Sequence, residues 1–219
     1  MIVAAGCSSS GEAPAPTPAP SAAFVDADAM RRALLQPQDV GKTWTPSQQP
    51  PAPNSLVRLC GGDETPPAIP GAPAVVTAPL VDEGTKGAQT LDQIALVYPD
   101  ALAAAAGLAA LRVQAEACPT TLDEPAKKTE ERREPAYTET VSVAPLNPGG
   151  WSGFVVERHK VYEPAHPASA DTAVAVLTRS NVLLVDAYAI YVIGGRSAAP
   201  QFAADWRKLV GTTLGRVAG

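Results

Sequence analysis

Positive charge is not in excess in this sequence. Its 17 lysines and arginines are outnumbered by 22 aspartates and glutamates, which gives a net charge of −5. A protein that binds nucleic acid needs a basic face to meet the phosphates, and a polybasic membrane-binding patch needs clustered lysines or arginines. We therefore expect neither a nucleic-acid partner nor a polybasic contact with lipid.

Metal-binding residues are also scarce. The chain has two histidines, His159 and His166, and its three cysteines form no CxxC pair. Structural zinc sites usually bring such residues together at short spacings. The histidines are separated by six residues, and Pro164 and Pro167 flank His166, so these residues cannot form the helix of a zincin motif. We expect no metal site and no cofactor.

Two short motifs resemble catalytic loops, but each lacks an essential glycine. Gly41-Lys42-Thr43 resembles the end of a phosphate-binding loop, yet Gln36 stands where the first glycine is required. Ser152 resembles a hydrolase nucleophile, yet Phe154 stands where its second glycine is required. The sequence therefore predicts no catalytic residue, and we expect the protein not to be an enzyme.

No long hydrophobic run is present. The longest candidate, residues 182–193, is interrupted by Asp186 and two tyrosines, and a helix needs about 20 apolar residues to span a bilayer. Apolar residues nevertheless make up 46% of the chain. This composition is that of a globular domain with a core.

Cys7 is preceded by the small residues of Val3-Ala4-Ala5-Gly6 and followed by a serine-rich segment. Residues 13–20 then alternate alanine or threonine with proline. This layout is typical of a bacterial lipoprotein, in which the cysteine thiol carries a lipid and a disordered tether follows. The alternative is a cytosolic protein with a chance match. Two or three acyl chains anchor a protein firmly, at about 0.8 kcal/mol per buried methylene.

These features divide the chain into three parts. Residues 1–7 are interpreted as the remnant of a lipoprotein signal peptide, residues 8–23 as a disordered tether, and residues 24–219 as one folded domain. The expected location is the outer face of the cell membrane, with the membrane as a partner through the lipid anchor.

Cys60 and Cys118 remain as an even pair once Cys7 is lipidated. In an oxidising compartment such a pair is expected to form a disulfide. The alternative is two buried thiols.

The pattern of apolar residues predicts an α+β fold, an antiparallel sheet with helices on one or both faces. Expected helices cover residues 24–35, ended by Pro37, residues 101–117 and a C-terminal segment opened by Pro200. The apolar stripes are Leu102, Ala105, Ala109, Val113 and Ala117 in the second helix, and Phe202, Trp206, Leu209, Val210 and Leu214 in the third.

Expected strands are residues 74–81 at an edge, 90–98, 136–143, 153–162, 172–179 and 182–191, the last two joined by a tight Ser180-Asn181 turn. Residues 38–73 are expected to be irregular, and the charged residues 123–134 to form a solvated loop or strand end.

Aromatic residues make up only 5% of the chain, so the few present are informative. Tyr188 and Tyr191 are an odd number of positions apart, so they must point to opposite faces of one strand. One belongs to the core and the other faces solvent or a cleft. We take five aromatic side chains as candidate ligand-binding residues, with ordinary packing as the alternative: Trp44, Trp151, Tyr162, Tyr188 and Tyr191.

Several segments of the chain, taken together, carry a resemblance: residues 34–40 (LLQPQDV), Cys60, residues 99–101 before an alanine-rich helix that ends at Cys118-Pro119, Gly153-Phe154 and residues 179–185. With these segments the chain resembles the sensor-domain lipoproteins of high-GC Gram-positive bacteria, relatives of the extracellular domain of PknH-type serine/threonine kinases. The resemblance covers residues 26–216. It implies a disulfide-stabilised α+β fold with a large cleft for an unknown ligand. Those domains typically carry two disulfides, and this chain has cysteines for one.

Three functions follow as hypotheses. The first is a non-catalytic sensor that captures an unknown small molecule of the envelope in a cleft. The second is an interaction module that docks on an envelope enzyme or kinase ectodomain through an apolar surface. The third is an envelope hydrolase with a non-standard site, which would require convergent polar groups in a cleft.

Overall fold

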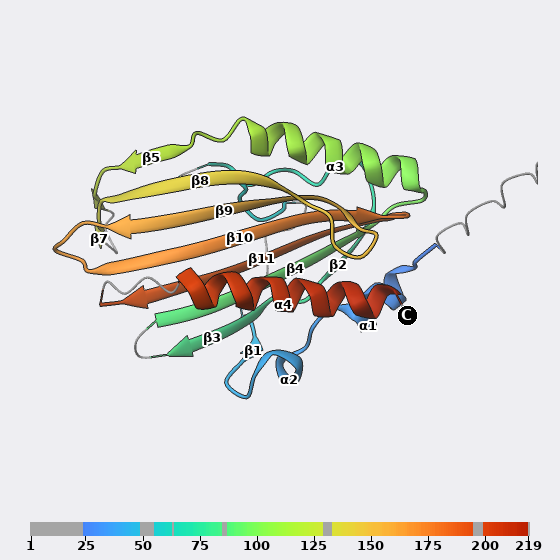
Figure 1. The fold of residues 1–219 in the computed structure, drawn as a ribbon, viewed down its shortest axis with the longest axis horizontal. Helices are drawn as coiled ribbons and strands as arrows, with labels where there is room; N and C mark the ends of the chain where they lie inside the picture. Colours follow the sequence, from blue (N-terminus) through green and yellow to red (C-terminus); the bar gives the residue numbers. More distant parts are fainter. Residues whose placement is uncertain are drawn as a thin grey trace, which may run out of the picture.

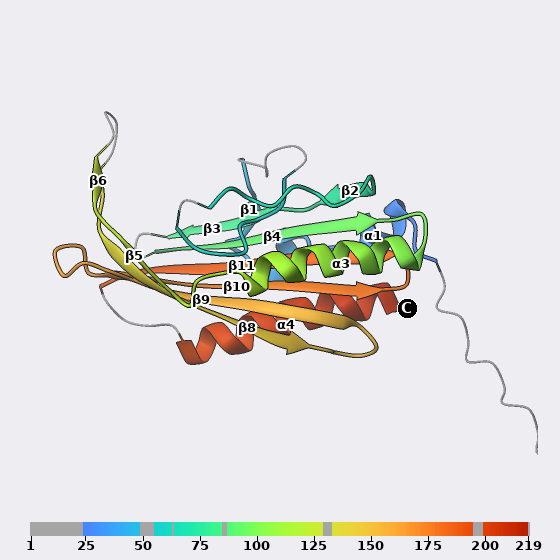
Figure 2. The same cartoon turned by 90° about the horizontal axis from the view of Figure 1, so that it is seen from above.

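The computed structural model describes residues 24–48, 55–62, 64–84, 87–128, 133–194 and 199–218. They form a large antiparallel sheet with helices on both faces and a small two-stranded ribbon (Figures 1 and 2). The helices are α1 (Ala27–Ala33), α2 (Pro37–Val40), α3 (Ala101–Glu116) and α4 (Ala199–Ala218). The strands are β1 (Thr45–Pro46), β2 (Ala74–Thr77), β3 (Leu80–Gly84), β4 (Gly87–Val97), β5 (Thr121–Glu124), β6 (Lys127–Lys128), β7 (Arg133–Glu134), β8 (Tyr137–Leu146), β9 (Ser152–Tyr162), β10 (Ala168–Arg179) and β11 (Val182–Ile193). The predicted α+β class is confirmed. Residues 1–23, with Cys7 and the expected tether, lie outside the described part.

The main sheet runs in the order β1–β3–β4–β11–β10–β9–β8–β5, and β2 also pairs with β4, while β6 and β7 form a separate ribbon. Its central strands are buried on both faces because helices cover both. In β11, Leu184 and Tyr188 belong to the core under α1 and α4. Leu183 and Val185 belong to the core under α3. We call these two sides the α4 face and the α3 face.

The β10–β11 hairpin turns at Ser180 and Asn181, as the sequence predicts. Ser180 has a φ of 53°, the left-handed conformation that a tight hairpin requires. Asn181 is buried, and its side-chain amide donates to the carbonyls of Val25 and Tyr98 while its oxygen accepts from the Val25 amide. The turn therefore also fastens the start of the folded domain to the end of β4.

Helix α3 packs on β9, β10 and β11, but with a different side from the predicted stripe. The buried residues are Ala104, Gly107, Leu111 and Ala115, whereas Leu102 and Val113 are 81% and 69% exposed. Periodicity could not identify the buried side because this helix is apolar almost all round. Gly107 decides it, since a Cβ there would lie 2.6 Å from the Tyr98 hydroxyl. Only a glycine allows α3 to approach the sheet this closely.

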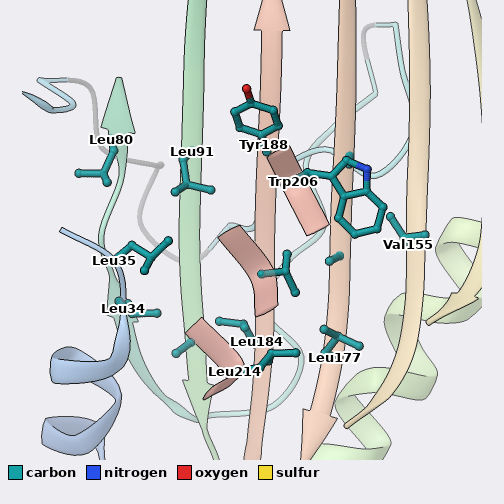
Figure 3. Close-up of a cluster of buried hydrophobic side chains, with 14 of the residues drawn as sticks. Leu34, Leu35, Leu80, Leu91, Val155, Leu177, Leu184, Tyr188, Trp206 and Leu214 are labelled. Atoms are coloured by element: carbon teal, nitrogen blue, oxygen red, sulfur yellow. The ribbon is translucent and has the colours of Figure 1, made fainter. Parts of the chain in front are cut away.

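The opposite face is covered by α1 and α4. Figure 1 shows α4 crossing in front of β4 and β11. Of the predicted α4 stripe, four residues are buried and Leu209 is half-buried, as expected for an amphipathic surface helix. The stripe meets a core that holds Leu34, Leu35, Leu80 and Leu91 (Figure 3).

The segment between α1 and β2 differs from the sequence prediction in detail. Pro37 ends no helix; it opens the short helix α2, where its fixed φ is tolerated and its missing N–H costs nothing. The predicted edge strand of residues 74–81 is two strands, because the chain breaks pairing at Ala78-Pro79. β3 also has β1 on its outer side. Of the charged residues 123–134, those described extend β5 and form the β6–β7 ribbon.

The expected disulfide joins Cys60 to Cys118 at the end of α3. A further contact fixes the Cys60 segment on the α3 face, since Arg158 donates to the Cys60 carbonyl at 2.7 Å. Glu139 lies beneath, 2% exposed, and accepts from the Gly62 amide. This irregular segment is therefore held in place by covalent and polar contacts.

Candidate functional site

A small cavity of about 140 Å³ lies on the α4 face between α2, α4 and strands β4 and β11. Its lining is half apolar and half polar: Leu35, Asp39, Val40, Trp44, Gln89, Tyr188, Asp205, Lys208, Leu209 and Thr212. A second hollow of about 340 Å³, at the ends of β3, β4 and β11, shares Gln89 in its lining. We call the first space the α2–α4 cavity.

Two of its apolar walls are positioned by specific contacts. Gln93, fully buried on β4, exchanges hydrogen bonds of 2.8 and 3.0 Å with the backbone of Leu35 and so fixes the junction of α1 and α2 on the sheet. Trp44 then folds back toward α2, because Gly41 leaves room for its ring; a Cβ there would lie 3.0 Å from Trp44 Cδ1. Trp44 is 8% exposed and packs in the core under α1 and α4.

The open side of α2 is tied to the last turns of α4. Arg216 donates to both carboxylate oxygens of Asp39, at 2.7 and 2.9 Å. This hydrogen-bonded guanidinium, with the backbone N–H of Gln36, lowers the pKa of Asp39 to about 2. Asp39 is therefore fully charged and already paired at neutral pH.

Tyr188 forms another wall and supplies a fixed hydroxyl. Its ring stacks on Phe202 with centroids 5.6 Å apart, and its hydroxyl donates to Gln89 Oε1 at 2.6 Å. In Figure 3 the Tyr188 oxygen points away from the leucines of the core. Burial raises the pKa of Tyr188, and the charges of Asp205 and Asp82 raise it further. The hydroxyl thus stays neutral and keeps the Gln89 amide oriented.

The remaining charges of the cavity are Asp205 and Lys208, on successive turns of α4. Asp205 is half-buried and Lys208 is exposed. Among the residues that the structure describes, neither has an opposite charge within 4.0 Å. Sequence reasoning missed both, because on a helical wheel they belong to the polar side of an amphipathic helix. They line a cavity only because α2 and Trp44 fold over that side.

Tyr162 and Tyr191 lie on the α3 face, in a second aromatic group at the far end of the sheet. The ring of Tyr162 meets Tyr137, His166 and Tyr191 edge-to-face, at centroid distances of 5.7, 5.3 and 6.0 Å. Tyr188 and Tyr191 thus point to opposite faces, as predicted. Sequence reasoning missed Tyr137 and His166. Tyr137 could be found only from the β8–β9 register, in which it lies directly opposite Tyr162.

An open hollow of about 590 Å³ adjoins this group, lined in part by Tyr137 and Tyr162. The charged groups around it already have partners. Glu124 pairs with Lys127 at 3.0 Å, and Asp123 accepts from Thr138 at 2.8 Å. The ammonium of Lys160 lies over the Tyr137 ring. The hollow is larger than the α2–α4 cavity, but its polar groups are largely satisfied within the fold.

Trp151, the fifth predicted aromatic, is 2% exposed within the core under α4 and lines neither space. A polar pair absent from the sequence prediction lies near the start of α4, where His159 Nδ1 and Asp171 Oδ1 are 2.6 Å apart beside a hollow of about 310 Å³. An acid–base pair of this kind needs a nucleophile in contact with the imidazole. In the described residues the ring of His159 has no hydroxyl partner.

Neither a metal cluster nor a membrane-spanning helix emerges from the described residues. No group of three or more histidine, cysteine or acidic side chains there could hold a metal ion. No described helix is both long and apolar enough to cross a membrane.

Comparisons with known proteins give a match in structure only. No protein-family model matches the sequence, and no curated protein matches it. The fold is similar to the crystal structure of the extracellular domain of PknH from Mycobacterium tuberculosis, with a TM-score of 0.52 and 18% identity. The match covers 86% of this chain and 98% of that one. The two chains therefore share the fold of a kinase extracellular domain, which is the fold that the sequence resemblance implied.

Proposed function

We propose that the protein is a lipid-anchored, extracytoplasmic lipoprotein whose α+β domain captures a small molecule of the cell envelope without chemical change. The Cys7 motif and the proline-rich tether support the anchor. The shared fold with a kinase extracellular domain supports a sensor-like role outside the cytoplasm. The Cys60–Cys118 disulfide is consistent with an oxidising compartment.

The α2–α4 cavity carries this proposal. Ligand sites are concave and mostly apolar, with a few convergent polar groups. Here apolar walls surround a fixed hydroxyl, an amide and two opposite charges that lack partners in the described part of the chain. The hollow beside Tyr162 is less suited, because Glu124 already pairs with Lys127 and Asp123 already accepts a hydrogen bond from Thr138.

Native mass spectrometry tests capture. The full chain with Cys7→Ser would be exported from a bacterial host and purified gently. We expect an additional non-covalent mass in this protein and its loss in Leu209→Trp, which fills the cavity. Tyr162→Phe, at the other aromatic group, should retain the mass. If no preparation of the protein carries an additional mass, capture is contradicted.

Membrane fractionation tests the anchor separately. When the gene is expressed from its native locus, we expect the protein in the membrane fraction and Cys7→Ser in the soluble fraction. The same distribution for both would contradict lipidation at Cys7.

One observation favours a second candidate function, a module that docks on another envelope protein. The outer side of α3 exposes Leu102 and Val113 with alanines between them. An exposed apolar surface of this kind commonly marks an interaction site. If docking is the function, the double variant Leu102→Gln/Val113→Gln should abolish co-purification of a partner. If ligand capture is the function instead, the double variant should capture ligand as the unmodified protein does.

A further inference from the structure

We propose that the α2–α4 cavity binds a free aliphatic amino acid, a small zwitterion held between Asp205 and Lys208. This inference rests on the proposed ligand-binding function and names the chemical class of its ligand. It follows from three properties of the cavity: its charges, its free donor and its size.

The charges of the cavity balance. The charge of Asp39 is already paired with Arg216 through two hydrogen bonds. That leaves Asp205 and Lys208, one of each sign, neither with an ion-pair partner in the described residues. A ligand that bears one charge would leave the opposite side chain unmatched, whereas a zwitterion matches both.

The spacing of the two side chains suits an α-amino acid. Residues three apart on a helix lie on the same side, with Cβ atoms about 5–6 Å apart. An ammonium and a carboxylate carried on one carbon can bridge that gap. In this arrangement the ligand ammonium donates to Asp205, and Lys208 donates to the ligand carboxylate.

Gln89 provides a further donor for the carboxylate. Its Oε1 accepts from the Tyr188 hydroxyl, which fixes the orientation of the amide. Its Nε2 has no hydrogen-bond acceptor among the residues described. Charge-assisted hydrogen bonds of this kind are stronger than those between neutral groups. The amide is therefore held in place and has a donor available.

The apolar walls and the volume limit the ligand side chain. Leu35, Val40, Trp44 and Leu209 line the cavity and would surround an aliphatic group. The volume of about 140 Å³ is well below the roughly 300–1,000 Å³ of sites for drug-sized molecules. The side chain is therefore small, of the size of alanine or valine.

Calorimetric titration of the full chain with L- and D-alanine and L- and D-valine tests the inference. Two analogues each remove one charge: N-acetylvaline lacks the ammonium, and valine methyl ester lacks the carboxylate. We expect binding of at least one free amino acid and at least tenfold weaker binding of both corresponding analogues.

Two variants assign the contacts. Asp205→Asn should abolish the preference for valine over N-acetylvaline, and Lys208→Gln should abolish the preference for valine over its ester. Arg207→Gln, on the same helix but outside the lining, is the matched control and should change neither preference. Equal binding of valine and both analogues, or preferences that survive both variants, would overturn the inference.

This experiment separates the two proposals. If the exported protein retains an additional mass in native spectra but no amino acid binds up to millimolar concentrations, the ligand class is wrong and capture stands. If both measurements find an empty protein, both proposals fail.

Discussion

Asp39 in α2 and Arg216 near the end of α4 are 177 residues apart in sequence and meet through two hydrogen bonds of 2.7 and 2.9 Å. No other ion pair in the described part of the chain links α2 to α4. Asp39 lines the α2–α4 cavity, so this contact ties one wall of the cavity to the last turns of α4.

Arg216→Gln should loosen this side of the cavity. The bridge is partly exposed, so its loss should cost only about 0.2–1 kcal/mol of unfolding free energy at pH 7. Because the bridge lowers the pKa of Asp39 from 3.8 to about 2, its contribution is full above about pH 4 and is lost as the pH falls through 2. Urea unfolding should show a difference from the unmodified protein at pH 7 that is much smaller at pH 2. An equal difference at the two pH values would contradict this assignment. Arg31→Gln, in an exposed pair with Asp28, is the control and should leave ligand capture intact.

Asp186 should make the protein less stable as the pH rises. It is 1% exposed in the middle of β11, and both its carboxylate oxygens lack a hydrogen-bond partner among the described residues. Burial, with the nearby charge of Asp92, raises its pKa from 3.8 to about 7. Between these values the folded state holds a proton that the unfolded state has released. The unfolding free energy should therefore fall by up to about 1.4 kcal/mol per pH unit from pH 4 to 7.

Asp186→Asn removes this titration and should flatten the pH dependence in that range, as measured by urea unfolding at half-unit steps. Glu83→Gln, at an exposed position on β3, is the control and should keep the slope. An unchanged slope in Asp186→Asn would show that another group is responsible.

A pair of glycine substitutions tests the packing of α3. Gly107→Ala places a methyl group 2.6 Å from the Tyr98 hydroxyl, which is itself held by the Pro70 carbonyl, and should cost about 1–3 kcal/mol. Gly211→Ala in α4 meets nothing within 4 Å and should stabilise the protein by about 0.5–1 kcal/mol. Chemical unfolding of both variants measures the difference. Equal effects would mean that α3 does not approach the sheet as closely as described.

The disulfide should contribute up to about 4 kcal/mol, because it closes a loop of 58 residues in the unfolded chain. Cys60→Ser/Cys118→Ser should lose most of that amount in urea unfolding, and reduction should affect only the protein that contains both cysteines. If reduction leaves the midpoint of the unmodified protein unchanged, the bond is absent or makes no contribution.

The sequence predicts those parts of the fold in which local patterns are unambiguous. Ser180-Asn181 marks the tight turn, and the spacing of Phe202, Trp206 and Val210 identifies the buried side of α4. The odd separation of Tyr188 and Tyr191 assigns them to opposite faces. In α3, by contrast, Leu102 and Val113 fit an apolar stripe as well as Leu111 does, so the choice depends on a tertiary contact at Gly107.

The cavity was only partly predictable for a similar reason. Trp44 and Tyr188 are conspicuous because aromatic residues are rare in this chain. Nothing in the sequence distinguishes Asp205, Lys208 and Gln89 from ordinary surface residues. The ion pair between Asp39 and Arg216 joins residues from nearly opposite ends of the folded domain in sequence. No local pattern encodes which surface residues α2 will cover.

The most direct test uses the three tryptophan indole N–H signals of the ¹⁵N-labelled protein. Trp44 lines the α2–α4 cavity, whereas Trp151 and Trp206 lie in the core. On titration with a low-molecular-mass extract of the cell envelope, we predict that the Trp44 signal shifts and saturates while the Trp151 signal stays in place. A spectrum in which Trp44 does not respond, or in which all three signals move together, would contradict capture in this cavity.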